Sequence, residues 1–444
     1  GALDLSLSFG FCAHNEDPVP PPDLHAPQVD LPAPPFEMEF ADPLNLRRSH
    51  DPNAKTGVAG VGDASFVQAN TPLAYRIDFE NFASATAPAQ IVTVRDPLSP
   101  DLDWASLELT EIGFGTVAIP IPPGRQNFNT IVDYDYADDD YDFAIQVHVE
   151  AWLENGTLTV HLISIDPATG LPPAVDVGFL MPETEPATGR GQGHVSCIIR
   201  PKSNLPSGTA IRNVATIQFD LAQEIDTNQV DPRDPSKGTD PNKEALVTID
   251  AGTPDSRVAA LPDQTGRTFL VSWSGQDEPG GSGVANYDIL VSTNGVDYHP
   301  WLTHTTSTNA FFTGDLGTTC SFFSVARDAV GYVEAPPAEA DARTTVSPDS
   351  PTGATVPIQV AAVGSTLVFT NTAQSTSGNG FLFAFGDGAP EGVSIDPSSG
   401  VLRWTPSCAQ ANQRYIFTVW VADALHPDLM DAIPVTVDMG ECVV

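Results

Sequence analysis

Apolar and polar residues alternate along much of the chain. A clear example lies at the N-terminus, where five apolar side chains occupy every second position over nine residues: Leu3, Leu5, Leu7, Phe9 and Phe11. Because successive side chains of a β-strand point to opposite faces, this period of two predicts strands with one buried face. No apolar pattern with helical spacing extends beyond two turns. We therefore expect an all-β protein.

Further strands are expected throughout the first half of the chain, at residues 73–79, 91–94, 143–153, 158–165, 195–199 and 211–219. With 444 residues and roughly 150 residues per domain, the chain has room for about three domains. We expect three tandem immunoglobulin-like β-sandwiches behind an extended arm. The predicted units are the arm at 1–46 and domains at 47–252, 253–346 and 347–444.

The arm consists of the N-terminal strand and a proline-rich spacer. Prolines cluster at residues 18–22 and continue to Pro35, which favours an extended polyproline conformation. A lone amphipathic strand is not stable in water and has to pair with a sheet. Two pairings are open. The strand either completes a sheet of its own chain, or it inserts into a neighbouring copy as a donor strand and joins copies head-to-tail.

Three segments resemble known modules. Residues 396–406, Asp-Pro-Ser-Ser-Gly-Val-Leu-Arg-Trp-Thr-Pro, resemble the signature of cadherin-like, immunoglobulin-like modules of secreted bacterial proteins, with Trp404 in the core. Residues 253–346 resemble a fibronectin type III-like module. The segments that carry this resemblance are Val271-Ser-Trp-Ser-Gly-Gln-Asp277, Gly281-Ser-Gly-Val-Ala-Asn-Tyr-Asp-Ile289 and Ser324-Val-Ala-Arg-Asp-Ala329. The resemblance implies that Trp273 and Tyr287 are core aromatics. Asn294-Gly295 is a hairpin signal, and Cys320 is expected to be a buried free thiol.

The unit at 47–252 has a resemblance of its own. Its opening, Asp51-Pro-Asn-Ala-Lys55, resembles the Asp-Pro-Asn-Asp-Lys start of a β-sandwich domain found near the C-termini of large secreted bacterial proteins. The closing segments 215–220 and 225–230 are similar to the end of that domain. Ala54 departs from the usual aspartate. This resemblance implies a fold and a secreted origin, but it implies no activity.

The net charge limits the classes of molecule that the chain can bind, and the cysteine content indicates its disulfide bonds. The chain carries 19 Lys and Arg against 57 Asp and Glu, a net charge of −38, so nucleic acid and anionic membranes would be repelled. No run of eighteen apolar residues predicts a membrane span. The five cysteines form no CxxC pair, and their low density is typical of a secreted β-sandwich with one or two disulfides. We expect Cys408 to pair with Cys442, and we consider a Cys12–Cys197 bond as well.

Calcium is the one cofactor that the sequence suggests, because loops rich in carboxylates supply the oxygen ligands of hard cations. Two loops qualify, and in each the alternative is an acidic loop that water alone solvates. The first comprises Asp133, Asp135, Asp138, Asp139, Asp140 and Asp142. The second comprises Asp226, Asn228, Asp231, Asp234 and Asp240.

The chain lacks the GxSxG, HExxH and P-loop motifs. We therefore expect a non-enzymatic structural protein on the outside of a bacterial cell, a filament or surface-layer subunit whose partners are other copies of itself or other surface proteins. The alternative is a non-catalytic adhesion or carbohydrate-binding region of a large secreted protein. An enzyme would require a cleft lined by paired acids, which no sequence pattern reveals.

Overall fold

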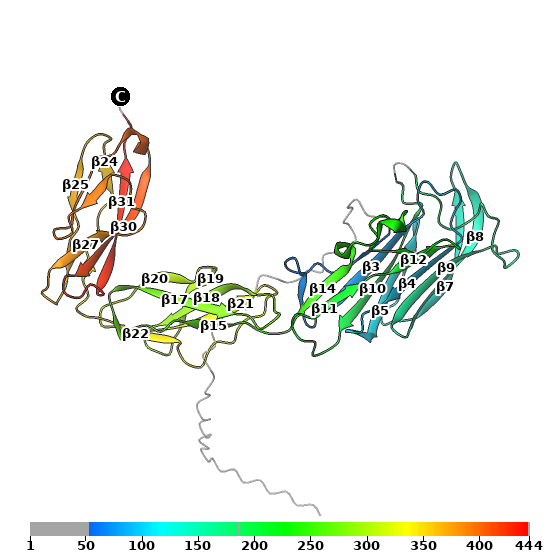
Figure 1. The fold of residues 1–444 in the computed structure, drawn as a ribbon, viewed down its shortest axis with the longest axis horizontal. Helices are drawn as coiled ribbons and strands as arrows, with labels where there is room; N and C mark the ends of the chain where they lie inside the picture. The colour runs from blue at the N-terminus through cyan, green and yellow to red at the C-terminus, as the bar shows by residue number, and fades with distance from the viewer. Residues whose placement is uncertain (1–52, 185–186, 443–444) are drawn as a thin grey trace, which may run out of the picture.

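The computed structural model describes residues 53–184 and 187–442. Within them, 31 strands are accompanied by three short 3₁₀ turns. Figure 1 shows three β-sandwiches that follow one another along the chain. Their main apolar cores contain residues 67–249, 258–346 and 361–439. The prediction of an all-β fold built from tandem sandwiches is confirmed.

The first domain packs two large sheets and one small sheet around a single core. In spatial order, the first sheet contains β1 (Ala54–Thr56), β3 (Leu73–Glu80), β10 (Gln192–Pro201), β5 (Leu102–Phe114) and β6 (Val117–Pro120). The second contains β13 (Ile225–Asp226), β12 (Thr216–Phe219), β4 (Ile91–Pro97), β9 (Thr157–Ile165), β8 (Asp142–Glu154) and β7 (Phe128–Ala137). The small sheet contains β11 (Ala210–Asn213), β14 (Ala245–Asp250) and β2 (Phe66–Gln68).

The expected strands of this domain occur close to their predicted bounds, with one exception. Residues 211–219 do not form one strand. The segment breaks after Asn213, and its two halves, β11 and β12, belong to different sheets. Its alternation is continuous because both halves bury every second side chain in the same core. The sequence pattern therefore could not reveal the change of sheet.

The second domain is a smaller sandwich. One sheet contains β15 (Asp255–Val258), β17 (Thr268–Gln276) and β20 (Asn309–Thr313), and the other contains β16 (Gln264–Thr265), β22 (Ala342–Val346), β21 (Thr319–Asp328), β18 (Val284–Ser292) and β19 (His299–Thr305). Trp273 and Tyr287 lie in its core, and Cys320 is a fully buried free thiol. Gly295, at a φ of +76°, lies in the loop of the β18–β19 hairpin, a backbone conformation that glycine adopts readily.

The third domain has a four-stranded sheet of β24 (Gln359–Ala361), β31 (Met430–Met439), β30 (Arg414–Asp423) and β27 (Phe381–Phe385). A three-stranded sheet of β25 (Leu367–Thr370), β29 (Val401–Trp404) and β28 (Val393–Ile395) packs against it, and β23 (Thr352–Gly353) pairs with β26 (Ala373–Gln374). Trp404 lies in the core. The turn before β29 is held by Asp396, whose carboxylate accepts hydrogen bonds from the backbone N–H groups of Ser398 and Ser399.

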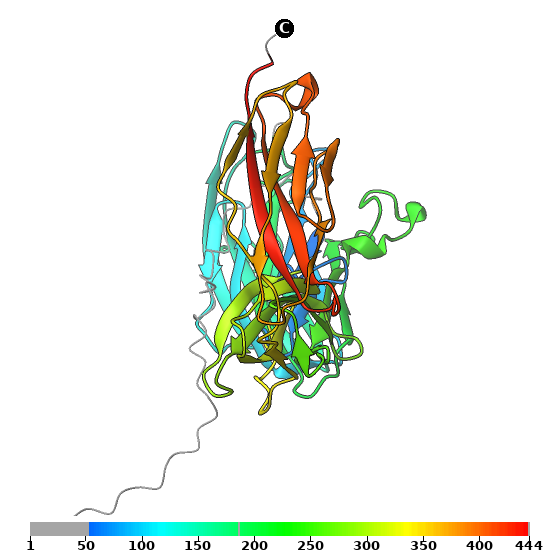
Figure 2. The ribbon, with the colours of Figure 1, turned by 90° about the vertical axis from the view of Figure 1, so that its left-hand side faces the viewer.

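One loop stands out from the first domain. In Figure 2 a green loop with short helical turns projects sideways from the sandwiches. It carries the 3₁₀ turns η1 (Pro235–Lys237) and η2 (Pro241–Lys243), each preceded by an aspartate whose side chain caps it. Cys408, in the 3₁₀ turn η3 (Cys408–Gln410), forms a disulfide with Cys442, which ties that turn to the segment after β31.

Candidate functional site at the domain junctions

Three aspartates converge where the first domain meets the second. Asp250 ends β14, Asp277 follows β17, and Asp328 ends β21. Each offers a carboxylate oxygen, and these oxygens all lie within 4.8 Å of one another. Asp250 is 0% exposed and Asp328 is 2% exposed. The fold thus gathers three acidic groups in a place that is largely closed to water.

Backbone N–H groups hold these carboxylates in position. Asp250 accepts a hydrogen bond of 2.8 Å from Ser282, and Asp277 accepts one of 2.7 Å from Gly283. One oxygen of Asp328, Oδ1, accepts two, from the N–H groups of Gly331 and Tyr332. Its other oxygen, Oδ2, is buried and has no hydrogen-bond partner. An orphaned carboxylate oxygen is costly unless something else binds it.

Within the described ranges, no cationic side chain balances the negative charge of this cluster. Among the described residues, no Lys, Arg or His forms an ion pair with any of the three aspartates. Burial raises the pKa of Asp328 to about 6; the two backbone hydrogen bonds oppose this rise, and the charges of Asp250 and Asp277 add to it. Calcium is bound by oxygen ligands at about 2.3–2.6 Å, so two of its ligands lie at most about 5 Å apart. The spacing and the hard oxygen donors therefore fit a calcium ion.

The loop after β21 makes further contacts across this junction. The side-chain amide of Gln68 donates to the carbonyl of Val330 at 3.0 Å, and the N–H of Ala69 donates to the hydroxyl of Tyr332 at 3.4 Å. Because Tyr332 also donates its backbone N–H to Asp328, the acidic cluster and the domain contact share one loop. A change in the position of the Asp328 carboxylate should therefore alter the hydrogen bonds that this loop makes with the first domain.

The second junction is fastened by one buried carboxylate, Asp431 in β31. From the second domain, Asp431 accepts hydrogen bonds from Nη1 of Arg267, at 3.0 and 3.2 Å, and from the hydroxyl of Thr268, at 2.8 Å. Within its own domain it accepts from the N–H of Gly353 at 2.9 Å. Close packing adds to this contact: a Cβ at Gly266 would lie 2.3 Å from the backbone nitrogen of Met430. Only glycine fits there without movement.

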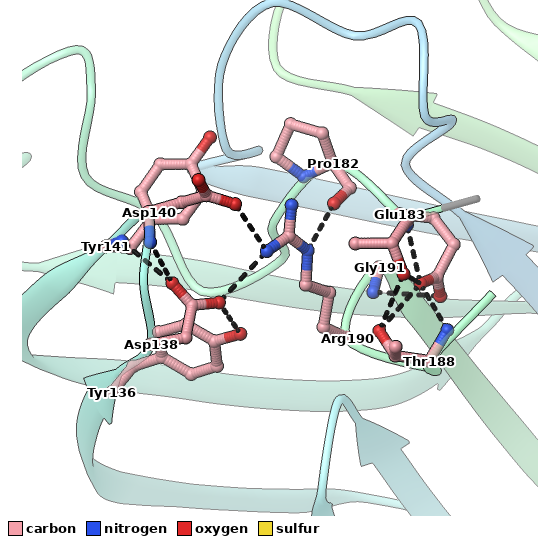
Figure 3. Close-up of polar contacts among 10 residues, drawn as sticks. Tyr136, Asp138, Asp140, Tyr141, Pro182, Glu183, Thr188, Arg190 and Gly191 are labelled. Atoms are coloured by element: carbon pink, nitrogen blue, oxygen red, sulfur yellow. Dashed lines mark hydrogen bonds and ion pairs between the residues drawn. The ribbon is translucent and has the colours of Figure 1, made fainter. Parts of the chain in front are cut away.

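The first predicted calcium loop lies in the β7–β8 hairpin and already holds a cation of the protein itself. Figure 3 shows the guanidinium of Arg190 between Asp138 and Asp140, at 2.9 and 3.0 Å, with its Nε donating to the carbonyl of Pro182. Asp138 also accepts from the hydroxyl of Tyr136. The remaining carboxylates of the loop are exposed: Asp133, Asp135, Asp139 and Asp142. Calcium binding here stays a prediction.

In the second predicted calcium loop, the acidic side chains have separate partners and do not converge on one point. Asp234 and Asp240 cap η1 and η2, and Asp231 pairs with Lys237 at 2.6 Å. Asp226 accepts a hydrogen bond from Thr216, and Asn228 donates one to Glu244. In the described part of the chain, Asp250, Asp277 and Asp328 form the one group of three His, Cys, Asp or Glu side chains within reach of a single ion. No sequence pattern predicted that group, although Asp277 and Asp328 both lie in segments that carried the fibronectin-like resemblance.

The predicted assembly strand, Leu3 to Phe11, and Cys12 lie outside the described residues. Cys197 lies in β10 as a buried free cysteine, and burial raises the pKa of its thiol to about 12. Among the described residues, no helix has the length and apolar character needed to cross a membrane.

Comparison with known proteins gives two partial family matches. Residues 51–117 match the family described as "Domain of unknown function (DUF7619)", and residues 343–428 match the family described as "Putative Ig domain". The second match agrees with the immunoglobulin-like sandwich seen there. The fibronectin-like module and the secreted bacterial origin stay predictions. No curated protein matches the chain.

Several solved structures are similar in parts. The group B streptococcus pilus 2b backbone protein is 12% identical over 66% of this chain and 96% of its own, with a TM-score of 0.26. The tandem Ig repeats of Dlar are 14% identical over 43% of this chain and 100% of theirs, with a TM-score of 0.26. Drosophila N-cadherin EC1-4 is 14% identical over 55% of this chain and 62% of its own, with a TM-score of 0.18. At these scores the structures indicate nothing about function.

Proposed function

We propose that the chain is an extracellular, non-catalytic structural protein that holds three β-sandwiches in a fixed arrangement. The observation that carries this proposal is the construction of the two junctions. Each is fastened through a buried carboxylate that accepts a hydrogen bond from the neighbouring domain, Asp250 at the first junction and Asp431 at the second. Flexible linkers between independent domains are usually exposed and few contacts cross them. Buried polar contacts across a boundary instead fix the relative position of two domains.

In this proposal calcium completes the first junction. Its ligands would be Asp250, Asp277 and Asp328, with the orphaned Oδ2 of Asp328 as one donor. The test compares thermal melts in calcium and in a chelator. We expect calcium to raise the midpoint in the wild type. Asp328→Asn should abolish this response and should stabilise the chelated protein, because it removes one of three like charges. Asp255→Asn, at an exposed site in β15, should leave the calcium response intact.

A calcium-independent midpoint in the wild type would contradict the metal site. It would leave the structural role standing, because that role rests on the direct hydrogen bonds of both junctions. A response of Asp255→Asn as weak as that of Asp328→Asn would also count against the site, since it would point to general screening of the acidic surface.

We further propose that the N-terminal strand joins copies head-to-tail. Burying each of its five apolar side chains would contribute about 1.5–3 kcal/mol, and a ladder of main-chain hydrogen bonds would add to that. Such a contact does not close on itself, so it produces filaments. Electron microscopy of the protein lacking residues 1–12 should show no filaments. A variant with Ser6 and Ser8 replaced by alanine should still form them, because its apolar face is intact. Filaments of the truncated protein would refute the donor-strand proposal.

The alternative is a non-catalytic adhesion or carbohydrate-binding region of a larger secreted protein. It predicts isolated rods from the wild type and retention on immobilised polysaccharide. The same micrographs therefore distinguish the two proposals.

A further inference from the structure

A lysine and an aspartate face each other inside the first domain, fully shielded from water. Lys55 lies in β1 and Asp96 in β4, on opposite sheets of the sandwich. The Nζ of Lys55 is 2.5 Å from Oδ2 of Asp96, and both side chains are 0% exposed. The other oxygen of Asp96, Oδ1, is buried without a hydrogen-bond partner. Burying two charges costs several kcal/mol per ion unless every lone pair is satisfied, so this pair is poorly explained as a stabilising contact.

The Lys55–Asp96 pair is surrounded by buried side chains. The ammonium of Lys55 lies 4.5 Å from the centre of the Tyr75 ring. Burial raises the pKa of Tyr75, and the charge of Asp96 raises it further. The buried thiol of Cys197 lies next to the pair. A lysine amine becomes a nucleophile once a neighbouring base has taken its proton, and the carboxylate of Asp96 is in contact with Nζ of Lys55.

A buried amide belongs to the same neighbourhood. The side chain of Asn213 is buried, and neither its Oδ1 nor its Nδ2 has a hydrogen-bond partner. Asn213 pairs in register with Ala245. A Cβ at Gly57, two residues after Lys55, would lie 3.5 Å from Cβ of Ala245 and 3.2 Å from the Tyr75 ring. Gly57 therefore lies between the Tyr75 ring, which Lys55 contacts, and Ala245, the register partner of Asn213.

The strand register also brings Asn213 toward Asp96. Thr216 of β12 pairs with Arg95 of β4 in an antiparallel ladder, so Ala215 and Asp96 are the next positions of that ladder. Asn213, Ala215 and Asp96 are all buried, and Asn213 is two residues from Ala215 along the chain. Lysine, aspartate and asparagine thus come from three strands to one region of the core.

We propose that Lys55 and Asn213 become joined by an intramolecular amide bond, with Asp96 carrying the protons. Asp96 takes one proton from the Lys55 ammonium, which frees the lone pair of Nζ. Nζ attacks Cγ of Asn213, and the bond between Cγ and Nδ2 breaks. Asp96 relays a second proton from Nζ to Nδ2, which leaves as ammonia, and stays protonated itself.

The balance of this step explains why these groups are buried together. The reactants are an ammonium, a carboxylate and a primary amide. The products are a secondary amide, a neutral carboxylic acid and ammonia, so no oxidant or co-reactant is needed. The step removes both buried charges, and the neutral Asp96 can donate a hydrogen bond to the new carbonyl. General acid–base transfer by a carboxyl group in contact with the nucleophile is the arrangement that such a step requires.

Asn53, whose buried amide also lacks partners, is a poorer acceptor. It precedes Lys55 by two residues on the same segment, so a bond there would close a small ring within one strand. The bond to Asn213 would instead tie β1 of one large sheet to β11 of the small sheet. Such a cross-link restricts the unfolded chain much as a disulfide does. It does not depend on filament formation or on calcium.

The test is the intact mass of the full chain after reduction of its disulfide. We expect the wild type to be lighter than its sequence mass by one ammonia molecule. Lys55 should resist trypsin, and a branched peptide should link it to Asn213. An unmodified mass would overturn the proposal. Loss of water with a Lys55–Asp96 branch, or a branch to Asn53, would also overturn it, because the acceptor would then be wrong.

Variants of Lys55 and Asp96 test the roles of nucleophile and proton carrier separately. Lys55→Arg keeps the charge but removes the amine nucleophile, and Asp96→Ala removes the proton carrier, so both should keep the full sequence mass. Lys202→Arg, at an exposed position of the same domain, should lose ammonia like the wild type. An ammonia loss that persists in Asp96→Ala would refute the role of Asp96. Because the wild-type mass alone decides whether the bond exists, misfolding of a variant leaves the central test intact.

Discussion

Replacement of Asp431 by alanine should uncouple the third domain from the second. Asp431 is 1% exposed and accepts hydrogen bonds from Arg267 and Thr268 across the junction. Alanine removes the acceptor and leaves the N–H of Gly353 without its partner. Thr268 retains a contact with Thr313 at 3.0 Å. The guanidinium of Arg267 can regain water, because its side chain is already 29% exposed.

The loss in free energy of unfolding caused by Asp431→Ala can be estimated from these contacts. Breaking a buried ion pair by removing one partner costs about 3–5 kcal/mol when the remaining charge stays buried. Because Arg267 is partly hydrated, we expect the lower end, about 3 kcal/mol. A matched control is Asp438→Ala on the same strand. Asp438 forms two hydrogen bonds with Arg414, but these side chains are 37% and 58% exposed. Exposed pairs of this kind contribute about 0–1 kcal/mol.

Urea unfolding of the full chain, followed by tryptophan fluorescence, measures this difference. The transition that reports on the third domain should move to lower urea in Asp431→Ala and hardly move in Asp438→Ala. Limited proteolysis should also cut Asp431→Ala earlier between the second and third domains. Equal costs for the two variants would refute the reasoning, because Asp431 would then contribute no more than a surface ion pair.

Three further predictions concern the third domain. Burial would raise the pKa of Asp423, but hydrogen bonds from Ser377, Asn379 and two backbone N–H groups lower it to about 2. The resulting stability is present above about pH 4 and is lost as the pH falls toward 2, so acid titrations of Asp423→Asn should lack this loss. Trp404→Ala should cost about 3–5 kcal/mol in chemical unfolding, since Trp404 is buried against Tyr415; a cost below about 1 kcal/mol would contradict its core role. Cys408→Ser should lower stability by roughly 3–4 kcal/mol, because the bond closes a long loop; an unchanged urea midpoint would show that the bond does not restrict the unfolded chain.

The sequence predicted well those features that depend on local periodicity. Strand β3 was expected at 73–79 and extends from Leu73 to Glu80, because its apolar residues alternate without interruption. Trp273 and Trp404 lie in cores, as the resemblances to known modules implied. Periodicity reports which side chains point inward, but it contains no information about which sheet a strand joins. For this reason the division of 211–219 into β11 and β12 could not be foreseen.

The chemistry of this protein depends on that missing information. The calcium ligands were predicted where aspartates lie close together in the sequence. Neighbouring residues of a strand, however, point to opposite faces, and carboxylates of an exposed loop repel one another and turn toward water. The hairpin of residues 133–142 shows this outcome, since only Arg190 draws two of its carboxylates together. Asp250, Asp277 and Asp328 converge because each comes at the end of a different strand, and strand ends of two sandwiches meet at a junction. Lys55 and Asp96 meet because their strands face each other across a core. Isolated acids at strand ends, and a lone inward-pointing lysine, are therefore the sequence signals to follow in chains of this kind, rather than runs of acidic residues.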